Sequence, residues 1–130
     1  MNAKQFLIIG ASVLTSSLGG RSFAEEKQGQ YVRIAELEVD PAQLESFKAA
    51  IQEVTETSVR VEPGCFVLYA VSEKENPARI RVFEIYRDEE AYQTHLQTAH
   101  FKKFRATTEG MVTSRKLIDT VPISLAAKAK

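Results

Sequence analysis

The order in which the hydrophobic period changes along this chain is the feature that most restricts its fold. Period-two segments rich in branched and aromatic residues predict four strands, over residues 31–39, 65–72, 79–87 and 112–121. Apolar residues at helical spacing predict helices over 40–60 and 89–107. This β-α-β-β-α-β order predicts an α+β, ferredoxin-like fold, in which both helices cover one face of a four-stranded antiparallel sheet.

Turn and capping residues support these boundaries. Asp40-Pro41 fits the start of the first helix, and Pro63-Gly64 predicts the turn that follows it. Asp88 is positioned to cap the second helical region, which we expect to break near Thr98. The sequence therefore predicts the connections as well as the elements.

The central strands carry apolar residues on both faces, although two helices can cover only one of them. Strict alternation predicts that Phe66, Leu68, Phe83 and Ile85 lie together on the uncovered face. Monomers rarely expose an apolar patch of that size. We therefore expect a homodimer that closes sheet against sheet into a dimeric α/β barrel.

The first residues predict an export signal. Lys4 precedes an apolar run over residues 6–14 that is too short to span a bilayer, and Ser22 and Ala24 fit a small-x-small cleavage pattern. We expect a signal peptide over 1–24, a linker over 25–30, a domain over 31–122 and a flexible tail over 123–130. The alternative for the apolar run is a membrane anchor. The predicted location is periplasmic or secreted, with no membrane segment in the mature form.

Charge and cysteine content exclude several classes of function. The chain has 17 basic and 17 acidic residues, and removal of residues 1–24 takes away Lys4 and Arg21 but no acid, leaving a net charge of −2. This balance does not predict nucleic-acid binding. Cys65, the single cysteine, has no internal disulfide partner. Its apolar neighbours predict a buried, inert thiol, and the alternative is an intermolecular disulfide.

Four short segments stand out in the predicted domain: Glu62-Pro63-Gly64-Cys65, Phe83-Glu84-Ile85-Tyr86, Tyr92-Gln-Thr-His95 and Thr98-Ala-His100-Phe101. Together they resemble the antibiotic biosynthesis monooxygenase family, which includes quinol-type monooxygenases. The resemblance covers most of the predicted domain. It implies the same dimeric barrel and a histidine at the position of His95 that faces the pocket.

His95 and His100 are the chain's two histidines. On one continuous helix their spacing would place them about 140° apart, and only a break near Thr98 would turn both inward. The spacing differs from that of a zinc-binding helix, and the sequence offers no convincing third ligand, so we predict no metal. For His95 the residues alone leave a half-buried structural role open, and the resemblance favours catalysis.

A carboxylate at Glu84, within an apolar strand, costs free energy unless it is paired. It either positions a substrate together with Tyr86 or anchors another part of the structure. We expect Glu62, which precedes a turn, to be structural. The predicted catalytic residues are His95, Tyr86 and Glu84. The predicted substrate-binding residues are Tyr69, His100, Phe47 and Phe101, and Tyr69 has core packing as its alternative.

The resulting hypothesis is cofactor-independent oxidation of a small phenol or quinol by O2, with His95 as the base. No glycine-rich dinucleotide or phosphate motif precedes a helix, so no nucleotide cofactor is predicted. Related haem-degrading enzymes imply an Asn, Trp and His set, whereas this chain contains no Trp. Isomerisation of a small oxygenated metabolite and non-catalytic ligand binding, as in a stress protein, remain alternatives.

Overall fold

A computed structural model describes residues 29–129. The predicted signal peptide and most of the predicted linker lie outside these residues. The elements in chain order are β1 (Tyr31–Val39), a short 3-10 helix (Pro41–Gln43), α2 (Leu44–Val61), β2 (Cys65–Ser72), β3 (Arg79–Tyr86), α3 (Glu89–Gln97), α4 (Ala99–Thr108) and β4 (Val112–Asp119). Among the described helices, none has the length and apolar composition that crossing a bilayer requires.

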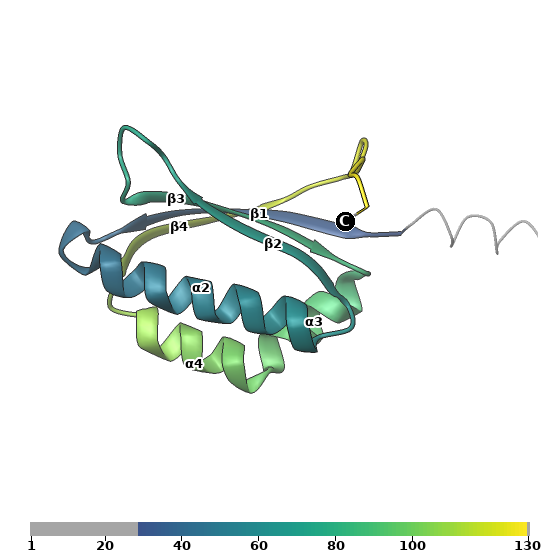
Figure 1. The fold of residues 1–130 in the computed structure, drawn as a ribbon, viewed down its shortest axis with the longest axis horizontal. Coiled ribbons are helices and arrows are strands. Elements are labelled where there is room, and N and C mark those ends of the chain that lie inside the picture. The colour runs from purple at the N-terminus through teal and green to yellow at the C-terminus, as the bar shows by residue number, and fades with distance from the viewer. Residues whose placement is uncertain (1–28, 130) are drawn as a thin grey trace, which may run out of the picture.

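The four strands form one antiparallel sheet in the order β2-β3-β1-β4. The three described α-helices lie beneath one face of this sheet, and within residues 29–129 no helix covers the other face (Figure 1). The α+β, ferredoxin-like arrangement expected from the sequence is therefore confirmed. The main boundary differences are that β3 ends at Tyr86 and β4 at Asp119.

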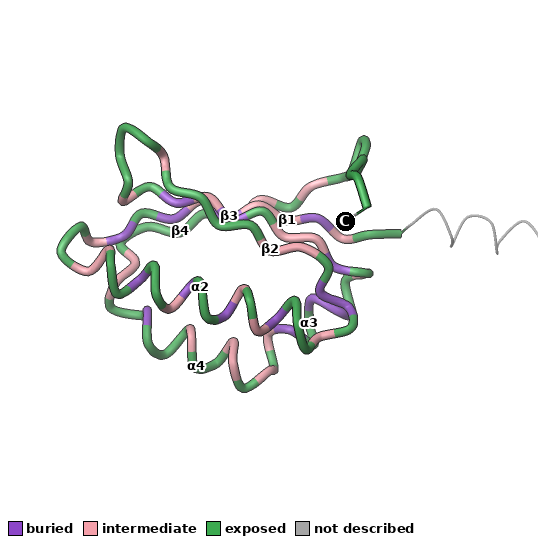
Figure 2. The backbone as a smooth tube through the Cα atoms, in the orientation of Figure 1, coloured by how far each residue is buried: buried purple, intermediate pink, exposed green. Residues whose placement is uncertain are grey.

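The main core lies between α2 and the middle of the sheet. Phe47, Ile51 and Val54, one helical stripe of α2, are buried against residues of β1 and β3 such as Leu37 and Val82. A second cluster, around Tyr86 and Tyr92, packs where α3 meets the ends of β2 and β3 (Figure 2). The two clusters leave room between them for a cavity on the helical side of the sheet.

A β-bulge corrects the predicted faces of β2. Cys65 pairs with Tyr86 and Val67 pairs with Ile85, so Phe66 is an extra residue without a partner on β3. The bulge shifts the alternation after Cys65. Leu68 pairs with Glu84 and consequently lies on the face that the helices cover, whereas Val67, Tyr69 and Val71 lie on the uncovered face.

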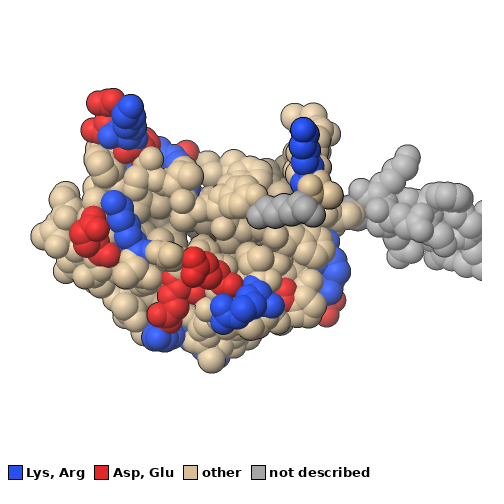
Figure 3. Space-filling view, viewed as in Figure 1, with Lys and Arg blue, Asp and Glu red and all other residues tan. Residues whose placement is uncertain are grey.

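The uncovered face remains apolar with this altered set of residues. One row across all four strands consists of Tyr69, Phe83, Ile34 and Ile118. Tyr69 is 62% exposed and Phe83 is 38% exposed. In the space-filling view, charged side chains gather over α2 and at the β2–β3 connection, and a broad area of other residues lies between them (Figure 3).

Candidate functional site

The site begins where α2 ends. Glu62 is the C-cap residue of α2, and Pro63-Gly64 then leads the chain into β2. A Cβ atom on Gly64 would lie 2.5 Å from the Cβ of Ala91, so only glycine permits α3 to approach this turn so closely. This close approach brings the end of α2 beside the histidines that follow Ala91.

Thr98 separates α3 from α4 and orients both histidines. Its extended backbone ends α3, and its hydroxyl donates to the carbonyl of His95 at 2.8 Å. The same hydroxyl accepts from the amide of Phe101 at 3.2 Å and so caps α4. The break near Thr98 that the sequence predicted is confirmed, and His95 and His100 turn toward the same carboxylate.

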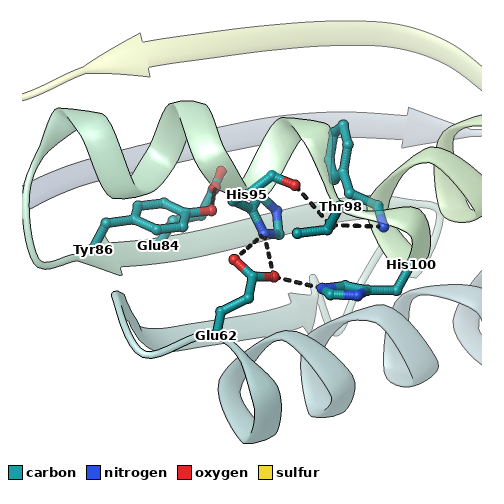
Figure 4. A network of polar contacts seen from close by, with 7 residues as sticks. Glu62, Glu84, Tyr86, His95, Thr98 and His100 are labelled. Carbon is teal, nitrogen blue, oxygen red and sulfur yellow. Dashed lines mark hydrogen bonds and ion pairs between the residues drawn. The ribbon is translucent and has the colours of Figure 1, made fainter.

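That carboxylate belongs to Glu62, which lies between the two imidazoles (Figure 4). Nδ1 of His95 lies 3.1 Å from Oε1 and 3.0 Å from Oε2 of Glu62, and Nε2 of His100 lies 2.5 Å from Oε2. An ionised carboxylate only accepts hydrogen bonds, so the facing ring nitrogens carry the protons. In a neutral His95 ring, Nε2 then has a free lone pair, and within residues 29–129 this atom makes no hydrogen bond.

His95, only 4% exposed, lines a cavity of about 100 Å³ between the sheet and the helices. An apolar cavity of about 150 Å³ is enough to bind benzene in a protein interior. A cavity of about 100 Å³ is therefore suited to a single ring at most. Its wall is mainly apolar and includes Phe47, Leu68 and Phe101.

Glu84 provides a second polar group in this wall. The hydroxyl of Tyr86 donates to Oε1 of Glu84 at 2.6 Å, so Tyr86 supports the carboxylate from behind. Burial raises the pKa of Glu84 above its ordinary value of 4.5, although the Tyr86 hydrogen bond, His95 and Arg33 oppose that shift. Burial also raises the pKa of Tyr86, which keeps this phenol protonated.

The structure brings four of the seven predicted site residues to one cavity, namely His95, Glu84, Phe47 and Phe101. Tyr86 is fully buried and reaches the cavity only through Glu84, while His100 lies behind Glu62. Tyr69 does not join them, because the bulge at Phe66 places it on the uncovered face.

The sequence reasoning missed other residues of the site. Glu62 was expected to be structural because it precedes the turn at Pro63-Gly64. Its histidine partners follow it by 33 and 38 residues, and no local pattern connects them. The chemical signal available was an acid next to a Pro-Gly turn in a chain with two histidines. Arg105 and Arg115, which also line the cavity, gave no signal in the sequence pattern.

Glu62 also corrects the expectation that the chain has no third metal donor. One ligand atom each from Glu62, His95 and His100 lie within 4.8 Å of one another. Two imidazoles and a carboxylate form a donor set that zinc uses. The N–O separations of 2.5 to 3.1 Å, however, are those of hydrogen bonds, so an ion would have to displace the shared protons. We therefore describe the three residues as a hydrogen-bonded triad.

Comparison with known proteins assigns this chain to a family. The family model described as antibiotic biosynthesis monooxygenase matches residues 30–107, which include the triad, Glu84 and most of the cavity wall. The chain belongs to the antibiotic biosynthesis monooxygenase family. The family resemblance expected from the sequence is thereby confirmed.

Solved structures of this monooxygenase family agree with that assignment. A protein from Bacteriodes thetaiotaomicron, assigned to the antibiotic biosynthesis monooxygenases, is 44% identical, with 78% of this chain and 96% of that chain covered and a TM-score of 0.74. A protein from Nitrosomonas europaea with the same assignment is 28% identical, with 74% and 93% covered and a TM-score of 0.70. None of the curated proteins matches this chain.

Proposed function

We propose that this monooxygenase-family protein oxidises a small phenolic or quinol-type substrate with O2 and without a cofactor. The observation that carries the proposal is the buried His95 imidazole at the wall of an apolar cavity, with Nδ1 bound to Glu62. A base held in one tautomer in a water-poor cavity can remove a phenolic proton. The substrate anion can then transfer an electron directly to O2.

For a hydroquinone the reaction balances without a further reductant. Nε2 of His95 accepts a phenolic proton, and the anion and O2 combine to form a C–O bond and a ring hydroperoxide. The ring carbon then loses its hydrogen as a proton while the O–O bond breaks, which leaves one oxygen atom in a hydroxyquinone and releases the other as water. The substrate supplies all four electrons, and the protein supplies positions for the protons.

The other polar residues have defined parts in this proposal. Glu62 orients His95, and His100 connects Glu62 to the surface, since its side chain is 19% exposed. Glu84, whose pKa is raised by burial, donates a hydrogen bond or proton to the oxygen that leaves as water. Tyr86 is a positioning residue that holds Glu84 through the 2.6 Å hydrogen bond.

The test is oxygen consumption by the purified protein with a hydroquinone, with mass analysis of the product formed under ¹⁸O2. We expect one labelled oxygen atom in the product and a rate reduced by about a hundredfold or more in His95→Ala. Gln93→Ala, an exposed change on the same helix, is the control. An unchanged rate in His95→Ala removes His95 from the chemistry, and quinone binding without turnover favours a ligand-binding role.

We also propose that the uncovered sheet face pairs with a second copy of the chain. The row Tyr69, Phe83, Ile34 and Ile118 supports this, because Tyr69 and Phe83 are large and exposed and the two half-buried isoleucines continue the apolar surface. Phe83→Glu should convert the dimer to monomer in analytical ultracentrifugation. Val59→Glu, at a 43% exposed position of α2, should not. Wild-type protein that sediments as a monomer at micromolar concentration would contradict the proposal.

Residues 1–24 are proposed to direct export to the periplasm or beyond, on the pattern of Lys4, the apolar run and Ala24. Mass spectrometry of the exported protein should find a new N-terminus near Glu25. Recovery of the full-length chain in the cytoplasm would contradict this proposal.

A further inference from the structure

The cavity has a positively charged mouth at a distinct part of its wall. Its lining includes Arg105 from α4 and Arg115 from β4, besides His95 and Glu84. Within the described part of the chain, α4 packs mainly on α2 and α3 and leaves the helical side of β4 uncovered. Leu117, which faces that side, is accordingly 48% exposed. The cavity therefore opens between α4 and β4, beside the two arginines.

Arg115 is a charged residue on the side of β4 that borders a mainly apolar cavity. It pairs with Leu37 of β1, whose side chain is buried in the core, so Arg115 projects on the same side of the sheet. Both Arg105 and Arg115 also line a shallow hollow that adjoins this mouth, together with Glu109. Among residues 29–129, neither arginine forms an ion pair with Glu109 or with any other acid.

Arg105 is also linked to the inner part of the cavity through aromatic packing. Its guanidinium lies 5.3 Å from the ring centre of Phe101, whose own ring centre lies 4.8 Å from that of His95. A ligand ring beside His95 would thus be separated from Arg105 by about one aromatic side chain. A short arm on that ring would extend to the arginines.

We propose that Arg105 and Arg115 form a carboxylate subsite, so that the substrate is an aromatic ring bearing a short carboxylate arm. Guanidinium groups bind carboxylates through paired hydrogen bonds of matching geometry. A cavity of about 100 Å³ accommodates at most one ring, and the charged arm extends toward the two arginines at its opening between α4 and β4. This inference deepens the proposed function, because it assumes that the ring lies beside His95.

The test compares anaerobic binding of homogentisate, a hydroquinone with an acetate arm, and of its methyl ester by isothermal titration calorimetry. Wild-type protein should bind the acid about tenfold more tightly than the ester, from two partly exposed charge pairs. The R105Q/R115Q double variant should lose this preference and retain its affinity for the ester. R115K should restore part of the preference.

Lys102→Gln is the matched control, since it removes one positive charge from an exposed position of α4 that does not line the cavity. Equal wild-type affinities for acid and ester would overturn the proposal. A preference that survives in R105Q/R115Q, or that falls as much in Lys102→Gln, would overturn it too. A lack of oxygen consumption with either compound would count against the proposed oxidation and leave the binding preference as a separate result.

Discussion

Replacement of Glu62 by alanine should destabilise the fold strongly, because it removes the carboxylate that bonds to both His95 and His100. The Glu62 side chain is 9% exposed and the His95 side chain is 5% exposed, so water cannot easily replace the missing carboxylate. Hydrogen bonds to a charged group each contribute about 1.5 to 3 kcal/mol. We expect the free energy of unfolding to fall by about 3 kcal/mol.

The measurement is urea unfolding near pH 7, followed by circular dichroism at one fixed protein concentration because dimerisation would shift the midpoint. Glu53→Ala is the control, since Glu53 accepts from Lys103 at 2.7 Å but is 60% exposed. Such exposed pairs contribute about 0 to 1 kcal/mol. If Glu62→Ala costs no more than Glu53→Ala, the triad does not stabilise this region and the reasoning is refuted.

Two further predictions concern other buried groups. Burial raises the pKa of Cys65 to about 12, and the residue is 3% exposed. A thiol reagent should therefore modify Cys65 only after denaturation, and rapid modification of the native protein would contradict this packing. Burial raises the folded-state pKa of Glu84 above 4.5, so the stability from this group is fully present below that pH and is lost as pH rises through the raised value. Melting temperatures measured from about pH 4 to pH 8 should therefore fall less steeply in Glu84→Gln than in the wild type, and identical profiles would exclude such a shift.

Much of the fold was predictable because its signals are local. Asp40, Asp88 and Thr98 act within three residues of themselves, through caps that the sequence displays directly. The bulge at Phe66 was not predictable, because it is defined by the register between β2 and β3. One unpaired residue was enough to place Leu68 among the helix-facing residues and Tyr69 on the opposite face.

Part of the site was also predictable, because some of its residues give local signals in the sequence. His95 and Glu84 carry polar groups in otherwise apolar local settings, which singled them out in the sequence. Glu62 acquires its partners only when the Pro63-Gly64 turn brings the end of α2 against α3. Arg105 and Arg115 line the same opening only because α4 and β4 lie on either side of it. These associations depend on tertiary structure and leave no trace in periodicity or spacing.

Proton transfer to His95 is tested most directly with a nitrophenol that binds in the cavity, since its anion absorbs at a longer wavelength than its neutral form. The probe is titrated without O2 at a pH below its own pKa, so that it is mainly neutral in solution. With the wild-type protein we predict that the anion band grows as the probe binds, and that with His95→Ala the bound probe stays neutral. An anion band of equal size in both proteins, or none in the wild type, would contradict the assignment of His95 as the base.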